Sequence, residues 1–359
     1  MQSRKNNIVL TGGHAATTAL AMVEEIRKRG NYDLHWLGAK HAFEGRDLGS
    51  LESKIFPKYG VDFVTLPSGK VRPLLKVPLD FIAAFYHLLK IRPRVVVSFG
   101  GFASFPVIVS AWLLRIPTIL HEQTAVYGRA SKASSFFARK IALSRPESAQ
   151  YFPMQKTVLT GNPILSQYFE IKPKKKIGLK PCILVTAGSR GSTFINELIF
   201  KLLPRLLAHF RLIHQVGEID WKKAQGLKLK LSSLSAKNYS VFSVVDPVDM
   251  PKLYSRADLV ISRSGANTCS EIMASRRPAI LIPLTISFAA EQEKNARLLE
   301  KAGLAFVLPQ KQAQPAKVLE LVKHIIDNYS QIKSSFLPIA NPDREAAKKL
   351  VDLILADPF

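Results

Sequence analysis

The stretch from Ser262 to Glu271, SRSGANTCSE, combines small residues with hydroxyl and carboxyl side chains in an order that suits an anion site. It follows the apolar run Ala257–Ile261, which is typical of a buried parallel strand, and precedes Thr268–Ser275, which is typical of a helix start. Gly265 and Ala266 let a ligand approach the backbone, and the free N–H groups of a helix N-terminus attract phosphate. We therefore predict a phosphate-binding turn here.

Glu271 lies one turn into this predicted helix, and two roles are open to it. Its carboxylate could accept hydrogen bonds from ribose hydroxyls. Alternatively, Thr268-Cys-Ser-Glu271 forms a capping box, in which Glu271 only satisfies a backbone N–H. The ten residues alone favour neither role, because a short motif has a real false-positive rate.

Three further turns follow predicted strands in the first half of the chain. Gly12 and Gly13 allow a tight turn, and His14 after them could take a proton from an attacking hydroxyl, or could simply be packed or cap a helix. Gly100-Gly101 forms a second turn that permits close approach. Glu122 ends another strand, where a buried charge needs a partner or a function. The three turns are Thr11–His14, Ser98–Ser104 and His121–Thr124.

Two motifs in the second half complete the set. The turn Ala187–Gly191 follows a predicted strand, with Asn196 one turn into the next helix, and is a second candidate phosphate turn. Gln292 and Asn295 share a helix face, and amide groups suit sugar hydroxyls because each both donates and accepts. Any one of the five motifs could be structural, but together they favour a nucleotide-linked ligand that bridges two domains.

The elements that position these motifs alternate between strand-like and helical patterns, which indicates an α/β fold with parallel sheets covered by helices. The predicted strands of the first half are Ile8–Thr11, Asp33–Leu37, Asp62–Leu66, Val95–Phe99, Thr118–His121, Ile141–Ser144 and Thr157–Thr160. Those of the second half are Cys182–Thr186, Leu212–Val216, Tyr239–Val245, Leu259–Ser262, Ala279–Pro283 and Ala305–Leu308. The segment Asp343–Ala356 has the spacing of an amphipathic helix.

A chain of 359 residues is expected to form two domains, since single cores rarely exceed about 250–300 residues. We place the boundary after Gly161-Asn-Pro163, so that residues 1–163 form one domain and 164–342 the other. The basic stretch 172–178 is then a solvated linker. Two doubly wound domains are expected to bind ligands at the carboxyl ends of their strands, in a cleft between them.

The composition bounds the partners. The net charge of +24 favours an anionic partner, such as a phosphorylated substrate or an acidic membrane surface. Nucleic acid ranks last, because no nucleic-acid-binding module is present. Cys182 and Cys269 are expected to be buried thiols with neither disulfide nor metal spacing. The sequence shows neither a signal peptide nor a spanning helix, so we expect a cytoplasmic protein.

The segment Leu74–Leu89 carries an apolar stripe formed by Leu79, Ile82, Phe85 and Leu89, which Phe81 and Leu88 widen. Basic residues flank it on both sides. One interpretation is peripheral docking on an anionic membrane leaflet. The other is a helix buried against the sheet, because wide apolar stripes are usually core. The flanking residues are Lys70, Arg72, Lys76, Lys90, Arg92 and Arg94.

The ordered motifs closely resemble those of the MurG family, bacterial N-acetylglucosaminyltransferases that convert lipid I to lipid II in peptidoglycan synthesis. The set covers nearly the whole chain, and its specificity lies in the order of its members. The motifs are Thr11-Gly-Gly-His14, Phe99-Gly-Gly-Phe102, His121-Glu-Gln123, Gly161-Asn-Pro163, Gly188-Ser-Arg-Gly191, Arg263-Ser-Gly-Ala266 with Thr268 and Glu271, Gln292 with Asn295-Ala296, and Glu300-Lys-Ala-Gly303.

The resemblance implies a GT-B fold of two Rossmann-like domains, with the last helix, 343–357, packing back onto the first. It also implies inverting transfer without metal or other cofactor, from UDP-GlcNAc to a lipid-linked acceptor at the cytoplasmic face of the membrane. The implied base is His14, with Glu122 second, and the implied acceptor-side residues are Gly100, Gly101 and Gln123. The implied UDP-GlcNAc-binding residues are Gly12, Gly13, Thr124, Ser189, Arg190, Asn196, Ser264, Gly265, Ala266, Thr268, Glu271, Gln292 and Asn295.

Several positions depart from the family pattern. Thr124 and Arg190 stand where Asn and Gln are usual, and Leu165 replaces an arginine. Ala289-Ala-Glu291 stands where Asp-Asp-His is usual before Gln292. Pro247, near the backbone position expected to contact uracil, has no N–H to donate. These changes leave two alternatives open: a transferase or epimerase that uses a UDP-sugar with a different acceptor, or a catalytically silent UDP-sugar-binding protein.

Overall fold

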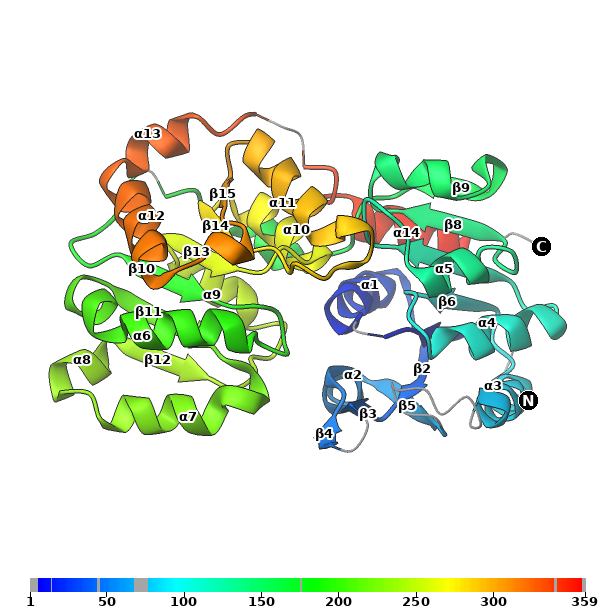
Figure 1. Cartoon of the computed structure of the whole chain (residues 1–359). Coiled ribbons are helices and arrows are strands. Elements are labelled where there is room, and N and C mark those ends of the chain that lie inside the picture. Colours follow the sequence, from blue (N-terminus) through cyan, green and yellow to red (C-terminus); the bar gives the residue numbers. More distant parts are fainter. Residues whose placement is uncertain are drawn as a thin grey trace. The chain divides into compact units, whose positions relative to one another are not determined.

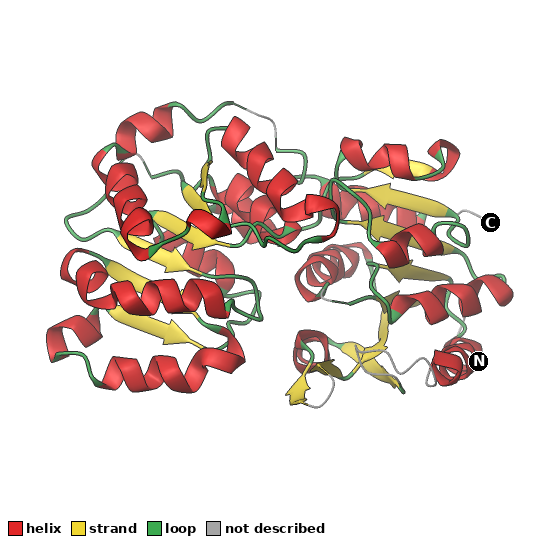
Figure 2. Cartoon of the chain, in the orientation of Figure 1, coloured by secondary structure: helices red, strands yellow, loops and turns green. Residues whose placement is uncertain are grey.

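The computed structural model describes residues 6–13, 15–43, 46–67, 77–174, 176–338 and 341–356. The chain forms two compact units (Figures 1 and 2). The first comprises Met1–Leu165 together with Pro342–Phe359, and the second comprises Ser166–Asn341. Each unit is an α/β layer structure built on a parallel sheet, as the alternation of strand-like and helical patterns predicts.

The first unit contains a seven-stranded parallel sheet in the order β5-β2-β1-β6-β7-β8-β9. Its strands are β1 (Asn7–Thr11), β2 (Asp33–Ala39), β5 (Val61–Leu66), β6 (Val95–Ser98), β7 (Thr118–Glu122), β8 (Lys140–Leu143) and β9 (Thr157–Leu159). The three central strands, β1, β6 and β7, are buried throughout, which explains their apolar runs.

Helices cover both faces of this sheet. They are α1 (Ala16–Arg29), α2 (Leu51–Ile55), α3 (Val77–Ile91), α4 (Ser104–Leu113), α5 (Arg129–Ser134) and α14 (Ala346–Leu355). The C-terminal helix α14, red in Figure 1, packs beside α1, and its Leu350, Val351 and Ile354 join the core that Ala19 and Met22 line. The amphipathic segment at the end of the chain is therefore a core element of the first unit.

One pair of strands was not predicted from the sequence. β3 (His41–Phe43) and β4 (Arg46–Gly49) pair in antiparallel fashion outside the main sheet. Their sequences, HAF and RDLG, lack the apolar run by which the other short strands were recognised.

The second unit contains a six-stranded parallel sheet in the order β12-β11-β10-β13-β14-β15. Its strands are β10 (Cys182–Val185), β11 (Arg211–Gln215), β12 (Tyr239–Phe242), β13 (Leu259–Ser262), β14 (Ala279–Leu281) and β15 (Ala305–Val307). Its helices are α6 (Thr193–His209), α7 (Gly217–Leu229), α8 (Ser233–Lys237), α9 (Met250–Arg256), α10 (Ala266–Ser275), α11 (Glu291–Lys301), α12 (Pro315–Asp327) and α13 (Tyr329–Ser334). All thirteen strands predicted from the sequence occur in the two sheets.

Each sheet has a topological switch point, where successive connections leave in opposite directions. In the first sheet β1 lies between β2 and β6, so the loops after β1 and β6 diverge at the carboxyl edge. In the second sheet β10 lies between β11 and β13 in the same way. Ligands of open α/β sheets bind at such points. The glycine-rich turns singled out in the sequence lie at both of them.

Within the described parts of the chain, no helix is both long and apolar enough to cross a bilayer. Cys182 and Cys269 are both buried and do not form a disulfide with each other.

Candidate functional site

In the first unit, the turns after β1 and β6 form one continuous backbone surface. The N–H of Gly13 donates to the carbonyl of Gly100 at 3.0 Å, and the N–H of Phe99 donates to Thr11 at 2.9 Å. Gly101 has a φ of +88°, and a Cβ there would lie only 2.8 Å from the nitrogen of Gly13. This close approach requires glycine. His14, the candidate base, lies outside the described residues.

Glu122 ends β7 with its side chain almost fully buried. Its carboxylate accepts hydrogen bonds from the N–H and the hydroxyl of Thr124, at 3.3 and 3.0 Å, and from the N–H of Gly128 at 3.1 Å. Burial raises the pKa of Glu122, while these hydrogen bonds and one from Ser131 oppose the rise. The carboxylate therefore shapes the loop that carries the partly exposed Gln123 and Thr124.

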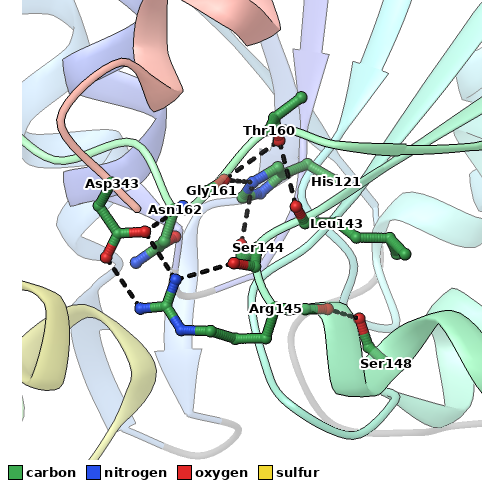
Figure 3. A network of polar contacts seen from close by, with 9 residues as sticks. All are labelled: His121, Leu143, Ser144, Arg145, Ser148, Thr160, Gly161, Asn162 and Asp343. Atoms are coloured by element: carbon green, nitrogen blue, oxygen red, sulfur yellow. Dashed lines mark hydrogen bonds and ion pairs between the residues drawn. The ribbon is translucent and has the colours of Figure 1, made fainter. Parts of the chain in front are cut away.

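His121, beside Glu122, belongs to a buried polar network (Figure 3). Its Nε2 lies 3.2 Å from both the carbonyl oxygen of Gly161 and Oγ of Ser144. Complete burial lowers the pKa of His121 to about 4, so the ring is neutral at physiological pH. His121, the first residue of the triplet His121-Glu-Gln, thus links the end of β7 to Ser144 after β8 and to Gly161 after β9.

The same network fastens the C-terminal segment to the first unit. Arg145 forms a two-pronged ion pair with Asp343, at 2.6 and 2.8 Å, and the N–H of Asn162 donates to the same carboxylate at 2.8 Å (Figure 3). Neither Arg145 nor Asp343 stood out in the sequence, because the two are nearly two hundred residues apart. Their pairing places the start of α14 against the end of β8.

In the second unit, α10 begins at Ala266, two residues earlier than predicted, directly after Ser264 and Gly265. No side chain caps this helix, so the capping box at Thr268 is wrong: Thr268 already lies inside the first turn. The N-terminus of α10 therefore lies at the switch point of the second sheet, where a helix dipole favours an anion.

Glu271 is buried beneath this helix start. The hydroxyl of Tyr254 donates to its Oε2 at 3.0 Å, and Tyr168 also hydrogen-bonds to the carboxylate. Burial raises the pKa of Glu271 to about 7, and the two tyrosines oppose the rise. The sequence did not indicate either tyrosine as a partner of Glu271, because such pairing depends on how η5 (Ser166–Glu170) and α9 pack against α10.

The loops after β13 and β14 are joined through side chains. Ser264 Oγ donates to the carbonyl of Gln292 at 2.7 Å, and Asn295 Nδ2 donates to the carbonyl of Ser264 at 3.2 Å. Gln292 Oε1 accepts from the N–H of Leu284 at 3.0 Å. Arg263, whose pKa burial lowers to about 10, donates from Nη1 to the carbonyl of Ile282 at 3.0 Å. Gln292, Asn295 and Ser264 thus lie together at the switch point.

The turn Ala187–Gly191 lies at the same switch point, after β10. Ser189 is partly exposed and Arg190 is exposed. Asn196, by contrast, is buried below the turn, where its Nδ2 donates to the carbonyl of Val216 at 2.8 Å and its Oδ1 lies 3.0 Å from His214 Nε2. Both polar atoms of the amide are therefore engaged with the protein.

Helix α3 presents an apolar face to the outside. Leu79, Ile82, Tyr86 and Leu89 are 50%, 66%, 60% and 50% exposed, and Phe85 is 37% exposed. We call these five residues the α3 apolar face. The helix packs on the sheet through its opposite side, where Ala84 and Leu88 are fully buried. The stripe predicted from the sequence is thus mostly exposed rather than core; Lys70, Arg72, Lys76 and the start of its segment lie outside the described residues.

A surface cavity of about 980 Å³ adjoins this face at the amino-terminal edge of the first sheet. Four arginines line it together with Leu89 and Trp112, and the described lining contains no acidic residue. Arg92 and Arg115 end α3 and α4 in the left-handed conformation, with φ of 50° and 54°. We call this the arginine cavity; its four arginines are Arg92, Arg94, Arg115 and Arg139.

The described residues contain no group of three or more histidine, cysteine, aspartate or glutamate side chains that could hold a metal ion. The chemistry available at the two switch points consists of backbone N–H groups, hydroxyls, amides and the two buried carboxylates. Such groups suit a phosphorylated sugar and a hydroxyl acceptor.

Comparison with known proteins agrees with this geometry. The model of the glycosyltransferase family 28 N-terminal domain matches residues 10–143, and that of the family 28 C-terminal domain matches residues 182–352. Two relatives, from Clostridium botulinum (strain Langeland / NCTC 10281 / Type F) and Lachnoclostridium phytofermentans, are both named UDP-N-acetylglucosamine–N-acetylmuramyl-(pentapeptide) pyrophosphoryl-undecaprenol N-acetylglucosamine transferase.

The Clostridium protein is 32% identical over 340 residues, covering 89% of this chain and 91% of the relative. The Lachnoclostridium protein is 32% identical over 367 residues, covering 97% and 98%. The crystal structure of Acinetobacter baumannii MurG superimposes with a TM-score of 0.67 at 24% identity, covering 97% of this chain and 99% of that one, and so shares the fold. The chain therefore belongs to glycosyltransferase family 28 and, within it, to the MurG glycosyltransferases.

Proposed function

We propose that this protein transfers N-acetylglucosamine from UDP-GlcNAc, with inversion, to the muramoyl 4-hydroxyl of undecaprenyl-diphosphate-linked MurNAc-pentapeptide. The observation that carries the proposal is the start of α10 at Ala266, at the switch point of the second sheet and surrounded by hydroxyl and amide side chains. Relatives that bear the name of this activity match nearly the whole chain.

The donor is held by the second unit. The N–H groups at Gly265 and Ala266 and the dipole of α10 face the diphosphate, with Thr268 in the first turn. The turn at Ser189 and Arg190 adds further donors. Glu271 accepts from the ribose, and Gln292 with Asn295 lies near the sugar. This arrangement stabilises the charge that develops on the leaving UDP without a metal ion.

The acceptor meets the carboxyl edge of the first unit. Its 4-hydroxyl oxygen attacks the anomeric carbon as the bond from that carbon to the diphosphate oxygen breaks, and its proton passes to the base. His14 is the favoured base, and Glu122 is the second candidate. The engagement of the Glu122 carboxylate by Thr124 and Gly128 supports this order, because a base needs a free lone pair.

Docking on the cytoplasmic leaflet completes the proposal. The lipid-linked acceptor brings its reacting sugar to the membrane surface, and the α3 apolar face and the arginine cavity lie side by side on the first unit. Apolar side chains enter the interface, while each arginine near an anionic surface contributes about 1 kcal/mol. Helix α3 therefore acts as a peripheral anchor.

Incubation of the purified protein with labelled UDP-GlcNAc and a lipid I analogue tests the reaction. We expect a labelled lipid product with a β-linked sugar. Labelled UDP-GlcNAc that is bound but never transferred to this acceptor would contradict the proposal. Parallel reactions with other UDP-sugars and other lipid-linked acceptors then identify the pair that this chain prefers.

A further inference from the structure

Gln215, at the carboxyl end of β11, reaches under the turn Ala187–Gly191 from the neighbouring strand. It is 3% exposed. Its Nε2 donates to the carbonyl of Gly188 at 3.3 Å, and its Oε1 accepts from the hydroxyl of Thr186 at 3.4 Å. The side chain thus contacts both the last residue before the turn and a peptide group within it.

This contact fixes the direction of one peptide unit. The carbonyl of Gly188 accepts from Gln215 on one side and from the N–H of Gly191, at 3.1 Å, within the turn. In a planar trans peptide the C=O and the following N–H point in opposite directions. A Gly188 carbonyl held towards β11 therefore aims the N–H of Ser189 away from the strand. Within the described structure, the N–H of Ser189 has no protein acceptor.

The backbone of the turn is shaped for an anion. Gly188 and Gly191 have φ of +73° and +70°, and left-handed residues within a turn make successive N–H groups converge. The turn also interlocks with the loop after β11. A Cβ on Gly191 would lie 2.0 Å from the carbonyl oxygen of Val216, so the backbones of the two loops are in close contact.

The support itself is rigid. Asn196 binds the carbonyl of Val216 at 2.8 Å and the carboxylate of Asp220 at 2.6 Å, and His214 lies 3.0 Å from Asn196 and 3.2 Å from the hydroxyl of Tyr239. These groups are all buried, so the strand end that carries Gln215 keeps one position. The position of the Gly188 carbonyl then depends on its hydrogen bond with the Gln215 amide.

We propose that Gln215 is a positioning residue for the donor phosphates: it orients the Gly188–Ser189 peptide so that the Ser189 N–H donates to the nucleoside diphosphate. Gln215 itself touches no ligand. The inference rests on the proposed function, since it assigns the diphosphate of the donor to this turn. The affinity for uridine, which lacks phosphate, should therefore not depend on Gln215.

The test compares the affinities of UDP and uridine by calorimetry and competition. Gln215→Leu removes the amide without adding charge, and Gln215→Glu keeps the shape but places an acceptor against the Gly188 carbonyl. We expect both variants to lose at least about tenfold in UDP affinity, the loss typical of one hydrogen bond to a charged group. The affinity for uridine should stay within about twofold of the parent value, a difference comparable to the scatter of such measurements.

The control is Gln312, an exposed residue of the same unit, substituted by Leu and by Glu, which should leave both affinities unchanged. Parent-like UDP affinity in Gln215→Leu would overturn the inference, and so would an equal loss of UDP and uridine, which indicates general damage to the unit. If Gln215→Leu fails to fold, the test rests on Gln215→Glu alone, again by comparing its loss of UDP affinity with its loss of uridine affinity. A parent protein that binds UDP no better than uridine would overturn this inference and the proposed donor site together.

Discussion

The two units have the same sheet architecture and a switch point in the same place, but they stabilise its turns differently. In the first unit the glycine turns after β1 and β6 hold each other by backbone hydrogen bonds, from Gly13 to Gly100 and from Phe99 to Thr11. In the second unit side chains from neighbouring elements hold the turns, among them Gln215 below Gly188 and Asn295 behind Ser264. The neighbouring turns are thus joined to each other through the backbone in the first unit and through side chains in the second.

This difference agrees with the proposed division of labour. A nucleotide-sugar needs hydrogen-bond donors at defined points, and side chains that support the turns of the second unit hold such donors in place. The first unit also carries the α3 apolar face and the adjoining arginine cavity, where we propose that the protein docks on the membrane. The first unit further depends on the C-terminal segment through Arg145 and Asp343.

The largest effect should come from the ion pair that fastens α14 to the first unit. The side chains of Arg145 and Asp343 are 11% and 0% exposed, so Asp343→Asn leaves a buried charge without its partner. We expect the free energy of unfolding to fall by about 4 kcal/mol, measured by urea denaturation. The matched control is Glu345→Gln, which breaks an exposed pair with Lys348 and should cost less than about 1 kcal/mol. Similar losses in both variants would refute the role of Asp343.

Glu271 links stability to pH in the second unit. Its pKa is raised from 4.5 to about 7 in the folded state, so folding favours the protonated form. The stability this confers is fully present below pH 4.5 and is lost as the pH rises through 7. Glu271→Gln, which keeps a neutral side chain, should match the parent near pH 4.5 and exceed it at pH 8 by about 3 kcal/mol. Thermal unfolding across this range measures the effect; a constant difference between the two proteins contradicts it.

The same variant should bind UDP less tightly although it is more stable. An ionised Glu271 is the better acceptor for ribose hydroxyls, so parent UDP affinity should rise with pH through about 7. Glu271→Gln should lose about tenfold at pH 8 and show no such rise. Glu293→Gln, on the exposed side of α11, serves as control and should behave as the parent does. A UDP affinity in Glu271→Gln equal to that of the parent would contradict the proposed contact between Glu271 and the ribose.

Docking on membranes should depend on the first unit alone. Ile82→Asn removes an apolar side chain that is 66% exposed, and we expect vesicle affinity to fall about tenfold with no loss of stability. Ile219, 52% exposed on α7 of the second unit, provides the matched control. Co-sedimentation with phosphatidylglycerol vesicles measures both variants. Equal losses from Ile82→Asn and Ile219→Asn would mean that docking is not a property of α3.

The smallest effect per residue should come from the arginine cavity. Gln in place of Arg92 and Arg115 together should weaken binding to anionic vesicles by about 2 kcal/mol at low salt, or about 1 kcal/mol per residue. Binding to vesicles with a lower anionic content should change less. The same pair of changes at Lys222 and Lys230, exposed on the second unit, alters net charge equally and should have little effect. Equal losses for the two pairs would indicate net charge rather than the cavity.

Most of the architecture could be predicted from local patterns. Buried parallel strands have long apolar runs, and the turns after β1, β6, β10 and β13 are rich in glycine, so both could be recognised without an alignment. Helix ends were less certain, as the early start of α10 at Ala266 shows. Helix starts are specified by caps, and Gly265 offers none.

Contacts between distant residues could not be predicted. The partners of Glu271 are Tyr168 and Tyr254, and the partner of Arg145 is Asp343; each pairing depends on how whole elements pack. Gln215 looked like an ordinary strand residue, because only the adjacency of β10 and β11 brings it to Gly188. The sequence also could not determine whether the apolar stripe on α3 faces the sheet or the solvent, since apolar spacing does not show which side of a helix packs on the sheet.

By itself, the sequence determined the α/β class, the thirteen main strands and the family of this protein. Apolar periodicity and glycine-rich turns are local patterns, so they can be recognised without knowing which remote residues lie nearby. Only the tertiary structure decided what those motifs hold. Whether an amide supports a turn or remains available to a sugar, and whether a stripe is core or surface, depends on neighbours supplied by remote parts of the chain. Asn196 and Gln215 show this, because both are buried amides near the turn Ala187–Gly191. Asn196 hydrogen-bonds to Val216 at the end of β11, whereas Gln215 hydrogen-bonds to Gly188 within the turn itself.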